Sequence, residues 1–237
     1  CTQEIEGDEL TEKQTITAYT YQDATHDWLA YSVSIDREQY TAGDIDEVVA
    51  RIREEMGSID IHDVDQLATL ALDAGIRITT FAEYTTTRDE KGFRPEYNLA
   101  AIEEREDDAV VTKQILSAYA YQNDYRDWFQ YQVSIDLETA AEDTSFVSFA
   151  DILQRVDSHM GSFGMLDADT IAALDIPLGV TVTTFTNFVN EQGDPQQRAQ
   201  YTFSLEETAE NGSVERERIL TRYCYQEDYP GEMSFSL

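Results

Sequence analysis

The chain has 237 residues, of which 41% are apolar and 11% aromatic, enough to bury one or two hydrophobic cores. Its formal net charge is −32, from 48 acidic and 16 basic residues. Nucleic acids and anionic membrane surfaces bind through clustered Lys and Arg, so this charge excludes both as direct partners. Regular apolar alternation and 2 Trp, 14 Tyr and 10 Phe residues argue against intrinsic disorder.

An acidic, lysine-poor surface over an ordinary apolar core is typical of a halophilic protein, because concentrated salt screens the repulsion between its charges. The alternative is an acidic protein from ordinary surroundings that is stabilised by bound divalent cations. Composition alone leaves both open.

Residues 1–11 are predicted to form a tether or arm before the first folded repeat. A chain that opens on Cys followed by a polar stretch is typical of a processed lipoprotein, so Cys1 is the predicted lipid attachment site. Two alternatives stay open, namely a fragment that begins there or a disulfide between Cys1 and Cys224 in an oxidising compartment. Lipidation predicts an extracellular, surface-held protein that touches the membrane only through its lipid.

The chain repeats itself. Ala18–Asp36 and Ala118–Asp136 are identical at 11 of 19 positions, and the motif begins a third time at Tyr223. Fixed-period repetition predicts units that complete each other's cores, with atypical terminal units. The predicted divisions are repeat unit 1 at 12–111, repeat unit 2 at 112–214 and a partial third repeat, a hairpin that completes unit 2, at 215–237.

Each repeat opens with a predicted hairpin, which in the first repeat joins Thr15–Gln22 to Trp28–Asp36. The second strand alternates, and its predicted core face carries Leu29, Tyr31, Val33 and Ile35.

A helix follows, with Asp44 as its N-cap and Gly57 as a left-handed residue after its end; Ser148 and Gly161 are the counterparts in the second repeat. One apolar stripe predicts that the helix packs on a sheet. Its residues are Ile45, Val48, Val49, Ile52 and Met56, matched by Phe149, Ile152, Leu153, Val156 and Met160. Shorter helical segments are predicted from Asp63 and Asp167 to Gly75 and Gly179.

A second hairpin ends each repeat. Its first strands are predicted at Ile76–Thr86 and Val180–Val189, with a bulge at the paired threonines, and its second strands at Tyr97–Ala101 and Tyr201–Leu205. The sequence therefore predicts an α+β fold of two tandem ββααββ repeats, whose antiparallel sheets are covered on one face by helices, plus a C-terminal extra hairpin.

The sequence carries no recognised catalytic motif, and no cofactor is predicted apart from calcium. Asp-x-Asp occurs at Asp63 and Asp65 and again at Asp167 and Asp169, and hard oxygen ligands at this spacing suit Ca²⁺. The motif lacks the glycine and distal glutamate of a calcium loop, so capping of a helix is the favoured interpretation.

Repeated aromatic residues are the candidate contacts for a ligand or partner: Tyr19, Tyr119, Trp28 and Trp128. Aromatic rings combine a wide apolar area with a polar edge, which suits sugars and protein side chains. The alternative is that the repeated rings serve the fold.

These features predict a non-enzymatic, exported structural or adhesive module, or a filament subunit, that self-associates through sheet edges. The open edge of the first hairpin is expected to take a strand from another subunit, either residues 2–12 or the C-terminal hairpin. The alternative is a substrate-binding lipoprotein that captures a glycan or other small ligand on exposed aromatic residues, and an enzyme with carboxylate chemistry comes third.

Overall fold

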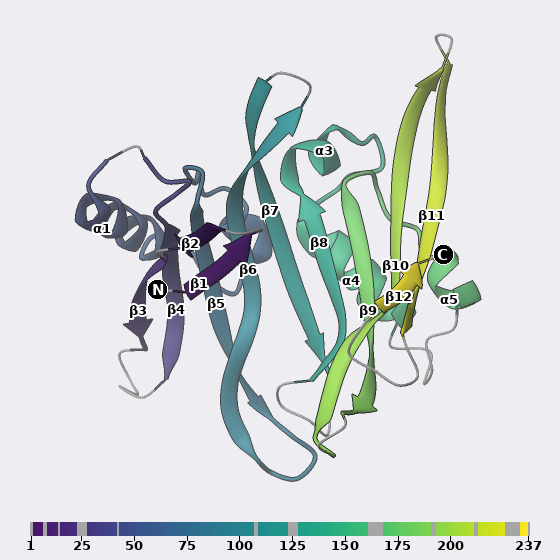
Figure 1. Cartoon of the computed structure of the whole chain (residues 1–237), viewed down its shortest axis with the longest axis horizontal. Coiled ribbons are helices and arrows are strands. Elements are labelled where there is room, and N and C mark those ends of the chain that lie inside the picture. The colour runs from purple at the N-terminus through teal and green to yellow at the C-terminus, as the bar shows by residue number, and fades with distance from the viewer. Residues whose placement is uncertain are drawn as a thin grey trace. The chain divides into compact units, whose positions relative to one another are not determined.

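The computed structural model describes residues 2–6, 9–13, 15–22, 28–41, 43–106, 109–122, 128–160, 168–190, 193–210, 213–225 and 233–236. It consists mostly of antiparallel sheet with a few helices, in agreement with the broad α+β class (Figure 1). The chain divides into two compact units. Unit 1 is Cys1–Tyr84 with Lys91–Leu116, and unit 2 is Thr85–Glu90 with Ser117–Leu237.

Unit 1 orders its strands β3-β4-β5-β6, followed by the N-terminal part of β7. The elements are β3 (Thr15–Tyr21), β4 (Leu29–Asp36), α1 (Ile45–Met56), α2 (Val64–Leu67), β5 (Ile76–Thr85), β6 (Lys91–Glu106) and β7 (Ala109–Tyr121). The segment expected to be a tether contains β1 (Thr2–Glu6) and β2 (Glu9–Lys13), which pair antiparallel in a sheet of their own.

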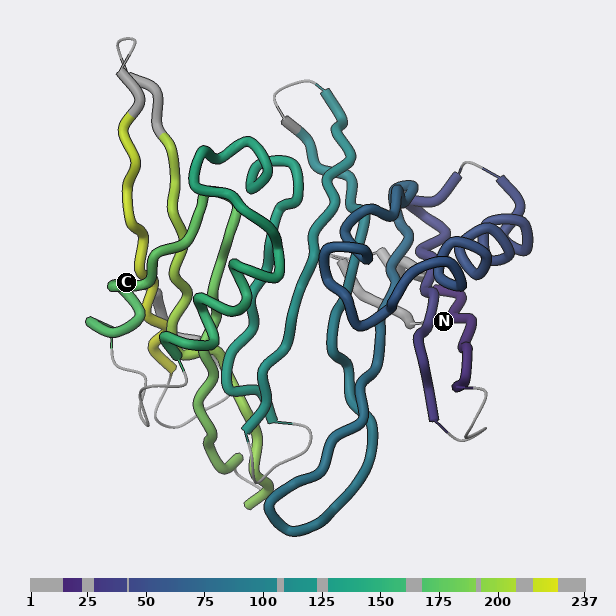
Figure 2. Tube along the Cα trace, turned by 180° about the vertical axis from the view of Figure 1, so that it is seen from behind, coloured from purple at the N-terminus to yellow at the C-terminus, as the bar shows by residue number. Residues whose placement is uncertain are grey.

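Unit 2 begins within β7 and orders its further strands β8-β9-β10-β11-β12. The elements are β8 (Phe129–Asp136), α3 (Leu137–Glu142), α4 (Phe149–Met160), α5 (Ala168–Ala172), β9 (Val180–Val189), β10 (Pro195–Glu210), β11 (Ser213–Tyr225) and β12 (Met233–Ser236). The strand β11 pairs antiparallel with β10. Seen from behind, the helices of unit 2 lie over one face of its sheet (Figure 2).

The core of unit 1 lies between its helices and one sheet face. Three buried cross-strand pairs line that face: Tyr31 with Thr80, Val33 with Ile78, and Ile35 with Ile76. The stripe of α1 that covers them is buried at Val48, Val49, Ile52 and Met56. Each fully buried aliphatic side chain contributes about 1.5–3 kcal/mol relative to exposure, so this face supplies much of the unit's stability.

Unit 2 builds its core in the same register. Tyr131 pairs with Thr184, Val133 with Val182, and Ile135 with Val180. Helix α4 buries Ile152, Val156 and Met160. The hydroxyl of Tyr131 donates to Asp157 on this helix at 2.8 Å, and burial together with that carboxylate raises the pKa of Tyr131.

The predicted start of α1 is confirmed, and its predicted end is wrong in one respect. The Asp44 carboxylate accepts the Asp46 N–H at 2.8 Å, as an N-cap does. Gly57 is right-handed, with φ −70°, because its N–H reaches the Arg53 carbonyl and closes the last turn directly. Gly75 and Gly179, at the entries to β5 and β9, are left-handed instead, with φ +80° and +73°. Gly161 lies outside the described residues.

Bulges alter two sequence predictions. Thr20 pairs with Tyr31 and Tyr21 with Leu29, so Ala30 is an extra residue in β4. One extra residue turns the next side chain away from its former face, and Leu29 is therefore half-buried and not part of the predicted core stripe. A second register shift does lie beside the paired threonines of β9, but its extra residue is Gln200 in β10.

Element lengths also differ from the predictions. β6 and β10 extend well beyond Tyr97–Ala101 and Tyr201–Leu205, because polar residues outside the core continue the ladder, as Glu207 does opposite Arg216. α2 ends at Leu67, long before Gly75. α3 was not predicted; Asp136 caps it by accepting the Thr139 N–H at 3.1 Å.

Candidate functional site

The first candidate binding site is the outer edge of β3. Among the described residues β3 pairs with β4 alone and ends the strand order. Its seven residues, Thr-Ile-Thr-Ala-Tyr-Thr-Tyr, carry no charge, although 27% of the chain is charged. Ile16, Tyr19 and Tyr21 are 38%, 53% and 50% exposed. Proteins usually guard such edges with charges or proline, so this unguarded edge can accept another strand.

The two tryptophans lie at the loop end of their hairpins, just before β4 and β8. The carbonyl of Trp28 accepts the N–H of Gln22 at 2.9 Å, and that of Trp128 accepts the N–H of Gln122 at 2.8 Å. Both tryptophans are half-buried. These bonds join backbone groups, so they mark where the pairing of each hairpin ends without depending on the tryptophan side chains.

Tyr119 is less accessible than its counterpart Tyr19. In unit 2, the ring of Phe129 lies 5.3 Å from that of Tyr119, 5.1 Å from Tyr121 and 5.4 Å from Phe185. Centroid separations of this size are typical of favourable aromatic pairs. The structure thus brings Tyr119 into an aromatic cluster and leaves the first-repeat tyrosines at the surface.

Three amide side chains support Phe129, and sequence reasoning missed them. Gln197 donates to the Phe129 carbonyl at 2.8 Å and accepts its N–H at 2.7 Å. Gln122 and Asn187 donate to each other at 3.2 and 3.1 Å. Gln122 belongs to the repeated Tyr-x-Tyr-Gln motif, which was the one available signal, whereas its partners come from strands 65 or more residues away.

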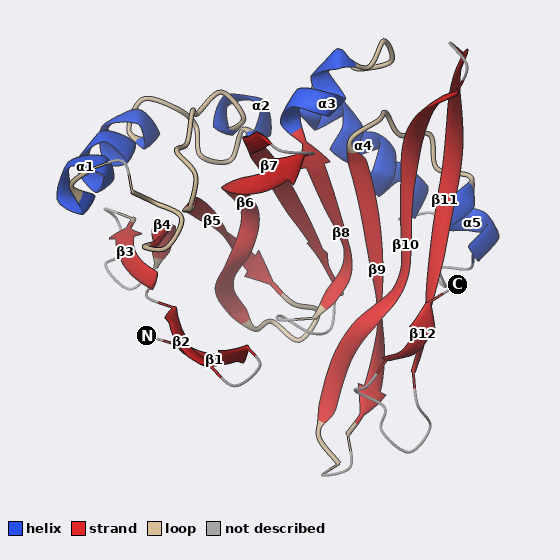
Figure 3. Cartoon of the chain, turned by 45° about the horizontal axis from the view of Figure 1, so that its top comes forward, coloured by secondary structure: helices blue, strands red, loops and turns tan. Residues whose placement is uncertain are grey.

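The third hairpin docks on β10 through the same tyrosine motif. The Tyr225 hydroxyl donates to the Ala199 carbonyl at 2.6 Å, and the Arg198 guanidinium lies 4.0 Å above the Tyr225 ring. Thr202 donates to the Tyr223 hydroxyl at 3.1 Å. Burial raises the pKa of Tyr225 against the opposing effect of Arg198. Figure 3 shows β11 running alongside β10.

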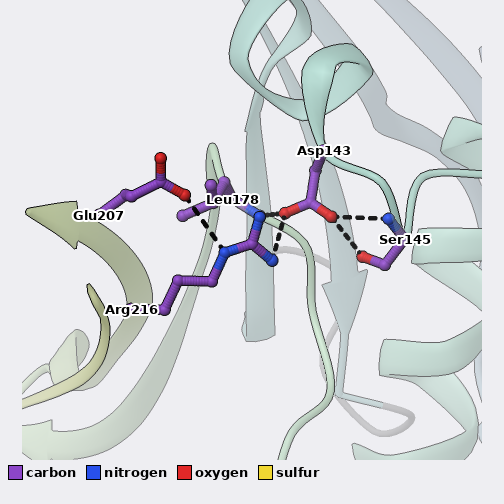
Figure 4. Close-up of polar contacts among 5 residues, drawn as sticks. All are labelled: Asp143, Ser145, Leu178, Glu207 and Arg216. Carbon is purple, nitrogen blue, oxygen red and sulfur yellow. Dashed lines mark hydrogen bonds and ion pairs between the residues drawn. The ribbon is translucent and has the colours of Figure 1, made fainter. Parts of the chain in front are cut away.

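A buried carboxylate holds β11 at a second point (Figure 4). The side chain of Asp143 is fully buried and accepts the N–H and hydroxyl of Ser145, each at 2.7 Å, and the N–H of Leu178 at 3.1 Å. Arg216 completes the set at 3.1 Å and also reaches Glu207 at 3.2 Å. Burial by itself raises the pKa of Asp143, but these hydrogen bonds and the guanidinium together lower it below its ordinary value.

The residues predicted to bind a metal have different roles in the structure. The Asp63 carboxylate accepts the N–H of Asp65 at 3.0 Å and the side-chain amide of Gln66 at 2.7 Å, and the bonds from Gln66 lower the pKa of Asp63. Asp63 is therefore the N-cap of α2, as the favoured interpretation expects. Asp65 and Asp169 lie in the first turns of α2 and α5.

Asp167 lies outside the described residues. Within the part of the chain that the structure describes, no three His, Cys, Asp or Glu residues group closely enough to hold a metal. A calcium site therefore stays a prediction.

Cys1 also lies outside the described residues, and its lipidation stays a prediction. In the described part of the chain, no helix is both long enough and apolar enough to cross a membrane. A comparison with protein-family models, curated proteins and solved structures finds no match to this chain.

Proposed function

We propose that this protein is a non-enzymatic structural module of the cell surface that self-associates by strand pairing at the outer edge of β3. The observation that carries the proposal is the uncharged, unguarded edge with Ile16, Tyr19 and Tyr21 exposed. Backbone groups along an added strand supply affinity, and exposed side chains on alternate faces supply specificity.

Charge supports association at this place over others. With 48 acidic against 16 basic residues, most surfaces of two copies repel each other. A charge-free strand is a place where two copies can approach without facing like charges, so the net charge directs assembly to the β3 edge. Added salt screens the remaining repulsion and is expected to strengthen assembly.

The finer architecture is part of this proposal. We infer that the two units are tandem repeats, since Val33 opposite Ile78 corresponds to Val133 opposite Val182. Repeat units bury surface against their neighbours, and an end unit therefore either carries a cap or receives a partner. The location at the cell surface rests on the prediction for Cys1, which an intact-mass measurement of the native protein tests.

The assembly proposal is tested by sedimentation velocity over a hundredfold range of concentration in molar salt. The wild-type chain is expected to form oligomers as concentration rises, and the double variant Tyr19→Lys with Tyr21→Lys is expected to stay monomeric. Val147→Lys is the matched control, because Val147 is 74% exposed and lies in the loop between α3 and α4. A wild-type chain that stays monomeric, or equal assembly in all three proteins, contradicts the proposal.

A second function has one observation in its favour. Tyr19 and Tyr21 expose about half of their surfaces, and exposed tyrosines also suit a glycan. This alternative predicts a monomer at all concentrations, whose tyrosine and tryptophan fluorescence shifts on titration with a soluble oligosaccharide and loses that shift with Tyr19→Lys.

A further inference from the structure

The first strands of the three hairpins have similar sequences, and the third of them, β11, pairs with β10. Residues 15–22 read TITAYTYQ, residues 115–122 read ILSAYAYQ and residues 219–226 read ILTRYCYQ. In this alignment Tyr19 corresponds to Tyr223 and Tyr21 to Tyr225. The exposed strand β3 is therefore a sequence counterpart of β11, whose partner in the structure is known.

The surface that receives β11 is defined residue by residue. In β10, Tyr201 lies opposite Arg222, Thr202 opposite Thr221 and Phe203 opposite Leu220. Phe203 is fully buried beneath this pairing. Beyond it, Arg198 and Ala199 hold the ring and hydroxyl of Tyr225.

Strand β3 has the residues to occupy the same surface. By alignment, Ile16 takes the place of Leu220 opposite Phe203, and Thr17 that of Thr221 opposite Thr202. Tyr21 then brings a ring to Arg198, as Tyr225 does. Ile16 and Tyr21 are both exposed in β3, at 38% and 50%.

We propose that β10 of one copy binds β3 of a second copy in place of its own β11, so that the third hairpin is an intramolecular cap over the assembly surface. This inference rests on the proposed function and names the partner of the β3 edge. Release of the cap frees β10, and each added copy then presents a β10 of its own. Such a head-to-tail contact, repeated from copy to copy, builds a chain of subunits.

The cap has two anchors that β3 lacks. Arg216 contacts Asp143 at 3.1 Å, and Arg218 donates to the Ala172 carbonyl at 3.2 Å. The aligned residues before β3 are Glu12 and Gln14. A glutamate cannot form an ion pair with the Asp143 carboxylate, so the cap outcompetes a second copy until its anchors are loosened or the concentration of subunits is high.

A disulfide that locks the cap tests this exchange. Thr202→Cys with Thr221→Cys, in a background with Cys1→Ser and Cys224→Ala, joins opposed residues of β10 and β11. The oxidised protein is expected to stay monomeric at concentrations where the reduced protein assembles. Equal assembly of the two forms overturns the exchange.

Cross-linking between copies tests the register. A chain with Thr17→Cys is mixed with a chain with Thr202→Cys in the same cysteine-free background, and a disulfide-linked dimer is expected under mild oxidation. Ser204→Cys, two residues along β10, is the register control and is expected to cross-link at least tenfold more slowly. No cross-link between Thr17→Cys and Thr202→Cys overturns the register and the exchange with it.

A third test weakens the contact between Arg216 and Asp143 and measures the rate of cross-linking between copies. Arg216→Gln is expected to speed the Thr17→Cys to Thr202→Cys cross-link about fivefold, the scale of one partly exposed ion pair. Arg222→Gln, an exposed position on the same strand, makes the same charge change without touching an anchor and is expected to leave the rate unchanged. Equal rates for the two variants overturn the anchoring role of Arg216.

Failure of this inference is distinguishable from failure of the proposed function. If the locked cap assembles fully but the Tyr19→Lys and Tyr21→Lys variant does not, β3 is the assembly edge and its partner is not β10. If wild type and the edge variant both stay monomeric, the proposed function is overturned as well.

Discussion

Asp143 and Arg216 contact each other at 3.1 Å, and each has no equivalent in the other copies of the motif. Asp143 lies in the insertion that distinguishes the second repeat from the first, and Arg216 aligns with Thr112 and Glu12. The ion pair is thus specific to the junction between the second repeat and the third hairpin. Both residues of the pair are therefore absent from the corresponding positions of the other copies.

The two partners of this pair are expected to contribute unequally to stability. Asp143→Ala leaves the N–H groups of Ser145 and Leu178 without their acceptor and is expected to lower the free energy of unfolding by about 2–4 kcal/mol. Arg216→Ala removes a side chain that is 44% exposed and should cost about 0.5–1 kcal/mol. Urea denaturation measures both, and equal losses would show that the ion pair outweighs the local hydrogen bonds.

The same carboxylate predicts a pH dependence. The pKa of Asp143 is lower in the folded chain than in the unfolded one, so its stabilising effect is complete above the unfolded pKa of about 3.9 and is lost as pH falls through the folded pKa. The stability difference between wild type and Asp143→Asn is therefore expected to be constant above about pH 5 and to shrink below pH 4. A difference that stays constant to pH 2 contradicts this assignment.

Three glycines separate backbone strain from steric contact. A Cβ on Gly179, at φ +73°, would lie 2.9 Å from the Ala140 nitrogen, whereas one on Gly193, at φ +86°, meets nothing within 4 Å. Gly193→Ala is expected to cost about 1–2 kcal/mol from the left-handed conformation, and Gly179→Ala distinctly more. Gly57→Ala, at φ −70°, serves as the control without left-handed strain. Thermal unfolding of the three variants checks this order.

Tyr225 and Tyr21 form a matched pair of aligned residues in different surroundings. Tyr225→Phe loses the bond to the Ala199 carbonyl and is expected to cost about 1 kcal/mol, while Tyr225→Leu also loses the contact with Arg198 and costs more. Tyr21 is 50% exposed, so the same changes there should leave monomer stability unchanged. Urea denaturation at low protein concentration measures all four variants.

Salt is expected to stabilise the fold. The net charge of −32 opposes compaction, and the screening length shrinks to about 3 Å at 1 M salt. The melting temperature should therefore rise from low to molar salt, and also with millimolar divalent cations. A melting temperature that does not change over this range contradicts the halophilic interpretation.

The sequence by itself determined the elements whose signals are local. Alternation located β4, β5 and β9, because side chains on a strand point to opposite faces in turn. The stripe of α1 and its cap at Asp44 followed from spacing within one helix. The absence of charge along β3 could also be read from the sequence, because it depends only on the composition of seven consecutive residues.

Only the tertiary structure decided which distant residues meet. Asp143 and Arg216 are far apart in the sequence, and no local pattern selects one pair among 48 acidic and 16 basic residues. Leu29 left the predicted core stripe because a bulge depends on the pairing of two strands and not on either strand alone. Tyr19 and Tyr119 share a motif but differ in exposure, because burial depends on the neighbours that each strand finds in space.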